Sequence, residues 1–164
     1  MGKKLKVLLA VLCAGLAAVA GFTGCTAAPK PSYENEGLCT EFSYHFGSYH
    51  GGYWEYDIYQ DGEQVYLTAQ GFNGVELAVE KAEVDALVLE DLVRIVEENQ
   101  IYQWDGYSKS DDDVLDGYGF GLAATFESGR TLSASGYMMY PKGYDEGHKA
   151  LADYLWALAK GIET

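Results

Sequence analysis

Cysteine is scarce in this sequence, which excludes a disulfide framework. The 164 residues contain three cysteines. Cys13 lies in the apolar N-terminal segment and Cys25 closely follows it, so Cys39 stands alone in the rest of the chain. The stability of the fold must therefore come from packing. We expect Cys39 to point into the core from a strand, because free cysteine is commonly buried; a reactive or intermolecular thiol is the alternative.

Basic residues are also few. Eleven Lys and Arg stand against 25 Asp and Glu, which gives a formal net charge of −14. A surface of this sign repels nucleic acid and anionic lipid headgroups, so neither is an expected partner. Cations and basic partners are attracted instead.

Familiar motifs of catalysis and metal binding are missing. The sequence has no HExxH, no CxxC, no G-x-S-x-G elbow and no phosphate-cradling glycine loop. His45, His50 and His148 do not have the spacing of zinc ligands. Neighbouring carboxylates such as Glu55 and Asp57 are able in principle to act in acid–base catalysis, but such pairs are also common on strand surfaces that have no catalytic role. We therefore assign no catalytic residue, expect binding rather than catalysis, and keep a carboxylate-based enzyme as an alternative.

The N-terminus has the plan of an export signal. Three lysines precede an uncharged apolar run over 7–22, whose 16 residues fall short of the roughly 20 that a spanning helix needs. The sequence then reads "FTGC" from 22 to 25. This tetrapeptide resembles the lipobox of bacterial lipoproteins, with Phe22 where leucine is usual. The resemblance implies cleavage after Gly24, acylation of Cys25 and anchoring at the extracytoplasmic face of the cell membrane.

The rest of the chain divides into a tether and one domain. Cleavage of the signal peptide, residues 1–24, removes three lysines and leaves 8 basic against 25 acidic residues, a formal charge of −17. Residues 25–37 hold the cysteine to be lipidated and a small, polar, proline-bearing stretch that is typical of a flexible tether. Residues 38–164 are enough for one hydrophobic core, so we expect a single acidic domain.

Two hairpins are predicted. In the first, a two-residue turn at Asp61-Gly62 sets three pairs opposite each other, namely Ile58 and Val65, Tyr56 and Leu67, and Trp54 and Ala69. In the second, a three-residue loop with Gly129 in the left-handed region sets Ala124 against Leu132 and Leu122 against Ala134, with a bulge. Residues 38–46 and 75–84 look like further strands of the same sheet.

Two helices are predicted from apolar stripes at helical spacing. Residues 85–100 carry Leu89, Leu92, Val93 and Val96, with Asp85 as N-cap, and residues 145–162 carry Leu151, Tyr154, Leu155 and Leu158. The order β-β-β-(β)-α-β-β-α favours an α+β domain, an antiparallel sheet of hairpins with helices on one face. Each hairpin precedes a helix, which is consistent with a degenerate internal repeat.

An acidic loop between the halves is a candidate ion or ligand site. Its aspartates are Asp105, Asp111, Asp112, Asp113 and Asp116. No register of an EF-hand fits this stretch, but exported modules can bind calcium weakly through such oxygens. The other interpretation is a hydrated connection with no cofactor.

Tyrosine is plentiful, with 14 in the chain. Tyr53, Tyr59 and Tyr66 share the polar face of the first hairpin. Either helices cover them, or they fill the periphery of the core with their hydroxyls in water, or they are free to bind a ligand. A second candidate aromatic surface consists of Tyr118, Tyr137, Tyr140 and Tyr144. If the second hairpin is antiparallel, the acidic loop and the segment after Gly136 lie side by side, which places these tyrosines around the aspartates.

The C-terminal half resembles a family of small, uncharacterised lipoproteins of Gram-positive bacteria. The resemblance covers roughly residues 85–158 and rests on four stretches, "WDGY" (104–107), "VLDGYGF" (114–120), "ASG" (134–136) and "PKGY" (141–144). It implies no settled activity. The expected function is thus a lipid-anchored binding domain, whose ligand is a protein or, as an alternative, a cell-wall glycan that stacks on exposed tyrosine and tryptophan.

Overall fold

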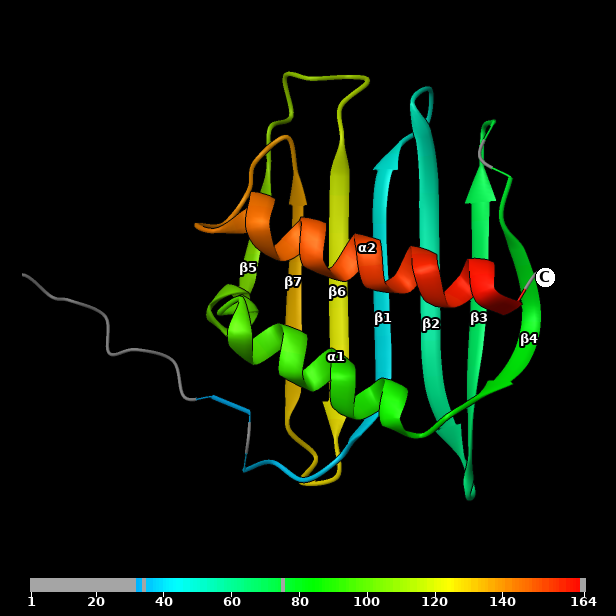
Figure 1. Ribbon diagram of the computed structural model, residues 1–164. Helices are drawn as coiled ribbons and strands as arrows, with labels where there is room; N and C mark the ends of the chain where they lie inside the picture. The colour runs from blue at the N-terminus through cyan, green and yellow to red at the C-terminus, as the bar shows by residue number, and fades with distance from the viewer. Residues whose placement is uncertain (1–31, 34, 75, 163–164) are drawn as a thin grey trace, which may run out of the picture.

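The domain is one seven-stranded sheet with two helices packed on the same face (Figure 1). This computed structural model describes residues 32–33, 35–74 and 76–162. The first strands are β1 (Cys39–Ser48), β2 (Gly52–Asp61), β3 (Gln64–Phe72) and β4 (Ala78–Val84), and the later ones are β5 (Tyr107–Ser110), β6 (Gly119–Phe126) and β7 (Thr131–Tyr137). Their order across the sheet is β4-β3-β2-β1-β6-β7-β5. All neighbours are antiparallel except β5 and β7, so the α+β class expected from the sequence is confirmed.

Helices α1 (Leu87–Glu98) and α2 (Tyr144–Ile162) both cross the strands on one side of the sheet (Figure 1). A short 3-10 helix, η1 (Ile101–Trp104), follows α1. The predicted helical stripes are the buried ones: Leu89 and Leu92 on α1 and Leu151 and Leu155 on α2 are almost fully buried. Helix α1 begins at Leu87, and the predicted cap Asp85 stands just outside, where its carboxylate still accepts a hydrogen bond from the Leu87 amide.

The core lies between the helices and every second residue of the strands. Phe42 and Tyr44 on β1, Tyr56 and Ile58 on β2 and Leu67 on β3 are at most 2% exposed. Because successive side chains of a strand point to opposite faces, the residues between them lie on the other face of the sheet. No described helix or strand covers that face, which we call the open face.

The predicted register of the first hairpin is wrong by two residues. Ile58 pairs with Leu67 and Tyr56 with Ala69, whereas Val65 pairs with Gln60. The turn occupies Gly62 and Glu63, with the positive φ on Gly62, the first central position, where type II′ turns place glycine. A shift of two residues keeps every side chain on its predicted face.

The second hairpin has the predicted register. Ala124 pairs with Leu132 and Leu122 with Ala134, and Gly129 has a φ of 82°. Strand β5, by contrast, falls in a stretch that we expected to be part of the acidic loop. It pairs in parallel with β7, far from it in sequence, and no local pattern indicates such a pairing.

The packed domain includes Tyr33, which lies within the predicted tether. Its ring is fully buried, stacks on Phe126 with centroids 4.7 Å apart, and its hydroxyl donates to the Thr131 carbonyl. Cys39 is 2% exposed, as expected for a core cysteine, and burial raises the pKa of its thiol to about 11. The lipobox and Cys25 lie outside the described residues. Of the two α-helices that the structure describes, neither has the length and apolar character to cross a membrane.

Candidate functional site

The open face carries the polar and aromatic residues of the first hairpin. Tyr53, Tyr59 and Tyr66 lie on it, each half-buried among its neighbours rather than covered by a helix. The interpretation that helices cover these tyrosines is therefore wrong. Neighbouring rings contact at inclined angles, with 32° between His45 and Tyr53 and 47° between Tyr53 and Phe72.

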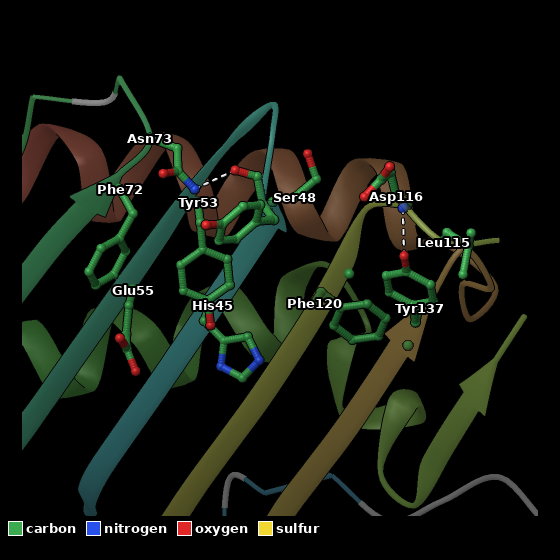
Figure 2. A pocket seen from close by; sticks show the side chains of 15 residues that line it. His45, Ser48, Tyr53, Glu55, Phe72, Asn73, Leu115, Asp116, Phe120 and Tyr137 are labelled. Atoms are coloured by element: carbon green, nitrogen blue, oxygen red, sulfur yellow. Dashed lines mark hydrogen bonds between the residues drawn. The ribbon is translucent and has the colours of Figure 1, made fainter. Parts of the chain in front are cut away.

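A pocket of about 710 Å³ opens at the end of the open face where β1 stops (Figure 2). Figure 2 shows His45, Tyr53 and Phe72 on neighbouring strands along one side of the hollow and Tyr137 and Asp116 on the other, with both helices behind the sheet. Its size is that of a ligand-binding cleft, and most of its lining is apolar. The polar side chains that line it are those of His45, Ser48, Tyr49, Tyr53, Glu55, Asn73, Asp116 and Tyr137.

Glycines shape the floor and rim of this pocket. Gly47 has a φ of 125°, and a Cβ there would lie 2.2 Å from the Gly52 carbonyl oxygen, so this close approach of β1 and β2 requires glycine. At Gly121 a Cβ would lie 2.2 Å from Cε1 of His45. The end of the His45 imidazole therefore lies over Gly121 of β6, and Gly119, two residues before it, also lines the pocket.

The rim of the pocket is held by hydrogen bonds from three loops. The Gly51 amide donates to Oγ of Ser48 at 2.8 Å, and the Asn73 side-chain amide donates to the Tyr49 carbonyl. On the opposite side the Gly117 amide donates to the Tyr137 hydroxyl at 2.6 Å. These contacts fix the aromatic walls before any ligand binds, which lowers the entropic cost of binding.

Two shallower hollows continue along the open face. The pocket shares Glu55 with a hollow of about 270 Å³, which in turn shares Asp57 with one of about 280 Å³. Five carboxylates line the three hollows, those of Glu41, Glu55, Asp57, Glu80 and Asp116. Among their described lining residues there is no lysine or arginine. Each hollow therefore has a negative potential that no cation within it offsets.

At the far end of the open face a lysine of the protein itself lies on the aromatic rings. Nζ of Lys81 is 3.8 Å from the centre of the Tyr66 ring and 5.5 Å from that of Tyr59. Glu83 lies beside this cluster, since its carboxylate accepts a hydrogen bond from Gln64. This end thus combines a cation, tyrosine rings and a carboxylate.

The predicted aspartates do not form one site. Asp105 precedes β5 and accepts a hydrogen bond from the Ser133 amide, whereas Asp111 follows β5, where its amide donates to the Tyr137 carbonyl. Asp112 and Asp113 are exposed, and a carboxylate oxygen of Asp116 lies 3.6 Å from Nε2 of His50. In the described ranges no three acidic, histidine or cysteine side chains are grouped to hold a metal ion. The weak calcium site stays a prediction.

The predicted proximity of the two loops is observed, but their tyrosines do not share one surface. The Tyr118 carbonyl accepts hydrogen bonds from the Met138 amide and the Tyr140 hydroxyl. Tyr118 is 52% exposed, and Tyr137 lines the pocket on the open face. Tyr144 lies on the covered face instead, where burial raises the pKa of its hydroxyl to about 12 and its ring stacks on those of Tyr140 and His148.

The covered face holds the buried polar groups. The Tyr44 hydroxyl lies 2.8 Å from Nδ1 of His148, whose pKa is lowered by burial. Among the described residues the Tyr56 hydroxyl is the one buried side-chain polar atom without a hydrogen-bond partner. Tyr56 also lines a small groove of about 220 Å³ beside α2, together with Trp54 and Trp156.

Several pocket residues were missed from the sequence. Phe72, Asn73 and Ser48 follow or end strands and carry no motif, and the residues on the other side of the pocket, Asp116 and Tyr137, come from a distant part of the chain. Alternation along 53–59 and 64–70 was the signal that pointed to this face. No protein-family model matches the chain, and no curated protein sequence matches it either.

Proposed function

We propose that this protein is a lipid-anchored binding domain that holds a polypeptide partner on its open face, outside the cytoplasmic membrane. The observation that carries the proposal is the pocket of about 710 Å³ at the end of a sheet face that no described element covers. A sheet face lined with tyrosine, phenylalanine and carboxylates is a surface on which a partner can bury aromatic anchors.

The size of the open face suits a protein partner. Seven strands at about 4.8 Å spacing and about eight residues long give a face of roughly 29 by 27 Å, or about 800 Å². A stable protein interface buries about this area on each partner.

The edges of the sheet are poor alternatives as docking sites. At one edge β4 has an irregular register against β3, and Glu80, Lys81 and Glu83 place charges along it. At the other edge β5 has four residues and includes Lys109. Short or irregular edges that carry charges are the usual means of preventing strand addition, so binding is directed to the face.

The orientation of the rings favours a protein over a glycan. Stacking on a sugar chain requires exposed, coplanar rings, whereas the interplanar angles of the ring pairs on the open face are 32°, 47° and 35°. Lys81 in addition lies over Tyr66 and Tyr59.

The pocket lies at the end of the sheet away from the proposed anchor. Strand β1 begins at Cys39, on the side from which the N-terminal segment reaches the sheet, and ends at Ser48 on the pocket rim (Figure 1). The nine steps between these two residues separate them by about 30 Å. Acylation of Cys25 would therefore attach the domain through the end of β1 that lies opposite the pocket.

The proposal is tested by site-specific photo-crosslinking on intact cells. A photoreactive phenylalanine analogue replaces Phe72 or Tyr49 on the open face and, as matched controls, Leu87 or Trp156 on exposed parts of the helices. We expect a discrete crosslinked protein from the open-face positions alone. Equal crosslinking from Leu87, or none from Phe72 and Tyr49, would contradict the proposal.

The anchor has its own test. Cys25→Ala should move the protein from the membrane fraction to the medium. Retention in the membrane would exclude acylation of Cys25 as the means of attachment.

A further inference from the structure

We infer that the open face binds a basic, extended segment and that its pocket takes a lysine or arginine side chain. This inference rests on the proposed function, since it names the chemistry of the partner at that same face. Three observations carry it: the charge of the hollows, the lysine already bound at one end of the face, and the spacing of the carboxylates.

The charge of the hollows is of one sign. Five carboxylates and no lysine or arginine line them in the described chain. The whole protein is acidic as well, with a net charge of −14. Both features favour a cationic partner. The net charge speeds its encounter with the protein, and its cations can pair with carboxylates that no lysine or arginine lining the hollows neutralises.

Lys81, a residue of the protein itself, illustrates how a basic side chain can bind on this face. At the far end of the face its ammonium group lies 3.8 Å from the centre of the Tyr66 ring, beside Glu83. The pocket end offers similar chemistry. The ring centres of Tyr53 and Phe72 lie 5.9 Å apart, and Glu55 also lines the pocket, but no lysine does. A partner's side chain can supply the missing cation.

The pocket suits both parts of a long basic side chain. The aliphatic stem packs on apolar walls, which include Phe72 and Leu115. The charged head can then pair with Glu55, whose carboxylate is held by a 2.8 Å hydrogen bond from Gln70, or with Asp116 at the rim. His50 is the side chain that faces Asp116, and both are largely exposed, so their contact is easily replaced.

The carboxylates are spaced like the side chains of an extended peptide. Glu55 and Asp57 are alternate residues of β2 and lie about 6.8 Å apart along the strand. Alternate side chains of an extended ligand have the same spacing, so a Lys-x-Lys segment that runs along β2 places one cation at each carboxylate. The first occupies the pocket and the second the adjoining hollow.

The test measures binding of defined peptides to the full protein in detergent by titration calorimetry. The probe is an acetylated, amidated hexapeptide of alternating lysine and alanine. The control peptide carries Nε-acetyl-lysine at the same positions, which keeps the stem and removes the charge. We expect the lysine peptide to bind at least tenfold more tightly than the acetylated one at 50 mM NaCl, with the difference falling at 300 mM.

Paired variants separate the pocket from the overall field. Glu55→Gln with Asp116→Asn removes two charges from the pocket, and Glu90→Gln with Glu98→Gln removes two from α1, behind the sheet. The first pair should lose tenfold or more in affinity for the lysine peptide and the second less than twofold. Glutamine at 55 keeps an acceptor for Gln70, and an unchanged melting temperature confirms that the fold is intact.

Three outcomes would overturn the inference: equal losses in the two pairs, equal binding of the acetylated peptide, or no binding of either peptide. These results are distinct from a failure of the proposed function. If crosslinking at Phe72 still captures a partner while the lysine peptide does not bind, the open face is an interface of another chemistry. If a neutral glycan added before irradiation prevents the crosslink, the partner is not held by basic side chains.

Discussion

The two faces of the sheet are made of alternate residues of the same strands, yet they differ in how deeply their side chains are buried. On the covered face Tyr44, Tyr56 and Leu67 have no exposed surface. On the open face their chain neighbours His45, Glu55 and Thr68 remain partly accessible to solvent. Burial of apolar surface is the main source of stability, so the covered face determines whether the protein folds. The open face is then free to carry side chains whose placement contributes little to folding, which is consistent with the partner that we propose for it.

The sharpest test of this division compares two adjacent residues of β3. Leu67→Ala removes a fully buried side chain from the covered face and should destabilise the protein by about 2–5 kcal/mol. Thr68→Ala, one residue along on the open face, should change stability by about 0.5 kcal/mol or less. Urea denaturation measures both. A comparable loss at Thr68 would mean that the open face is itself packed against something, for example a second copy of the chain.

Two glycines extend the comparison to added volume. A Cβ at Gly136 would lie 2.2 Å from the Met139 carbonyl oxygen and 2.5 Å from the Phe120 ring, groups that cannot easily move. Gly136→Ala should therefore cost about 1–3 kcal/mol through overpacking. At Gly121 the clash is also at 2.2 Å, but with the end of the His45 side chain, which can rotate away.

Gly121→Ala should thus leave stability nearly unchanged and instead move the imidazole within the pocket. Urea denaturation measures the change in stability, and titration with the lysine peptide detects the change in the pocket. If Gly121→Ala unfolds the protein as readily as Gly136→Ala, His45 is a packing residue and the pocket wall is rigid at that point.

Local patterns were sufficient to predict the faces and the register of the second hairpin, but not the register of the first hairpin or the pairing of β5. Alternation along β2 and β3 and the stripes on α1 and α2 depend on neighbouring residues, and burial follows them. The register of the first hairpin depends on which two residues form the turn, and both Asp61-Gly62 and Gly62-Glu63 satisfy the alternation. Nothing within Tyr107–Ser110 indicates a parallel partner at the sheet edge.

The pocket was harder to predict for a similar reason. Its walls come from residues as distant in sequence as Ser48, Phe72, Asp116 and Tyr137, each at a strand end or in a loop. The sequence indicated that the acidic loop and the segment after Gly136 are neighbours, because antiparallel geometry requires it. It did not indicate that the ends of β1 and β3 complete the same hollow, since that depends on the order of strands across the sheet.

Two polar groups on the covered face allow a comparison in which the expected changes in stability are smaller and opposite in sign. The Tyr56 hydroxyl is buried without a partner, so Tyr56→Phe should be neutral or stabilise the protein by up to about 1 kcal/mol. Tyr44→Phe removes the hydroxyl that contacts Nδ1 of His148 and should destabilise it by about 1–2 kcal/mol. The two variants make the same chemical change on adjacent strands, and thermal denaturation compares them directly. The same sign in both would mean that Tyr56 has a partner, such as a buried water.

The smallest expected effect is a dependence of stability on pH that arises from the covered face. Burial lowers the pKa of His148, while Asp145 and Asp153 act weakly in the opposite direction; Tyr44 and Tyr144 are the titratable groups that its ring contacts. As the pH falls, His148 is therefore protonated in the unfolded chain, at a pH near 6.5, before it is protonated in the folded protein. The stabilising contribution of neutral His148 is complete above that pH and is lost as the pH falls toward the lowered folded pKa. His148→Gln should flatten the fall in stability between pH 7 and 5, a range that lies above the pKa of Asp91, which its hydrogen bond with Arg94 lowers from 3.8. An unchanged slope in that variant would place the titrating group elsewhere.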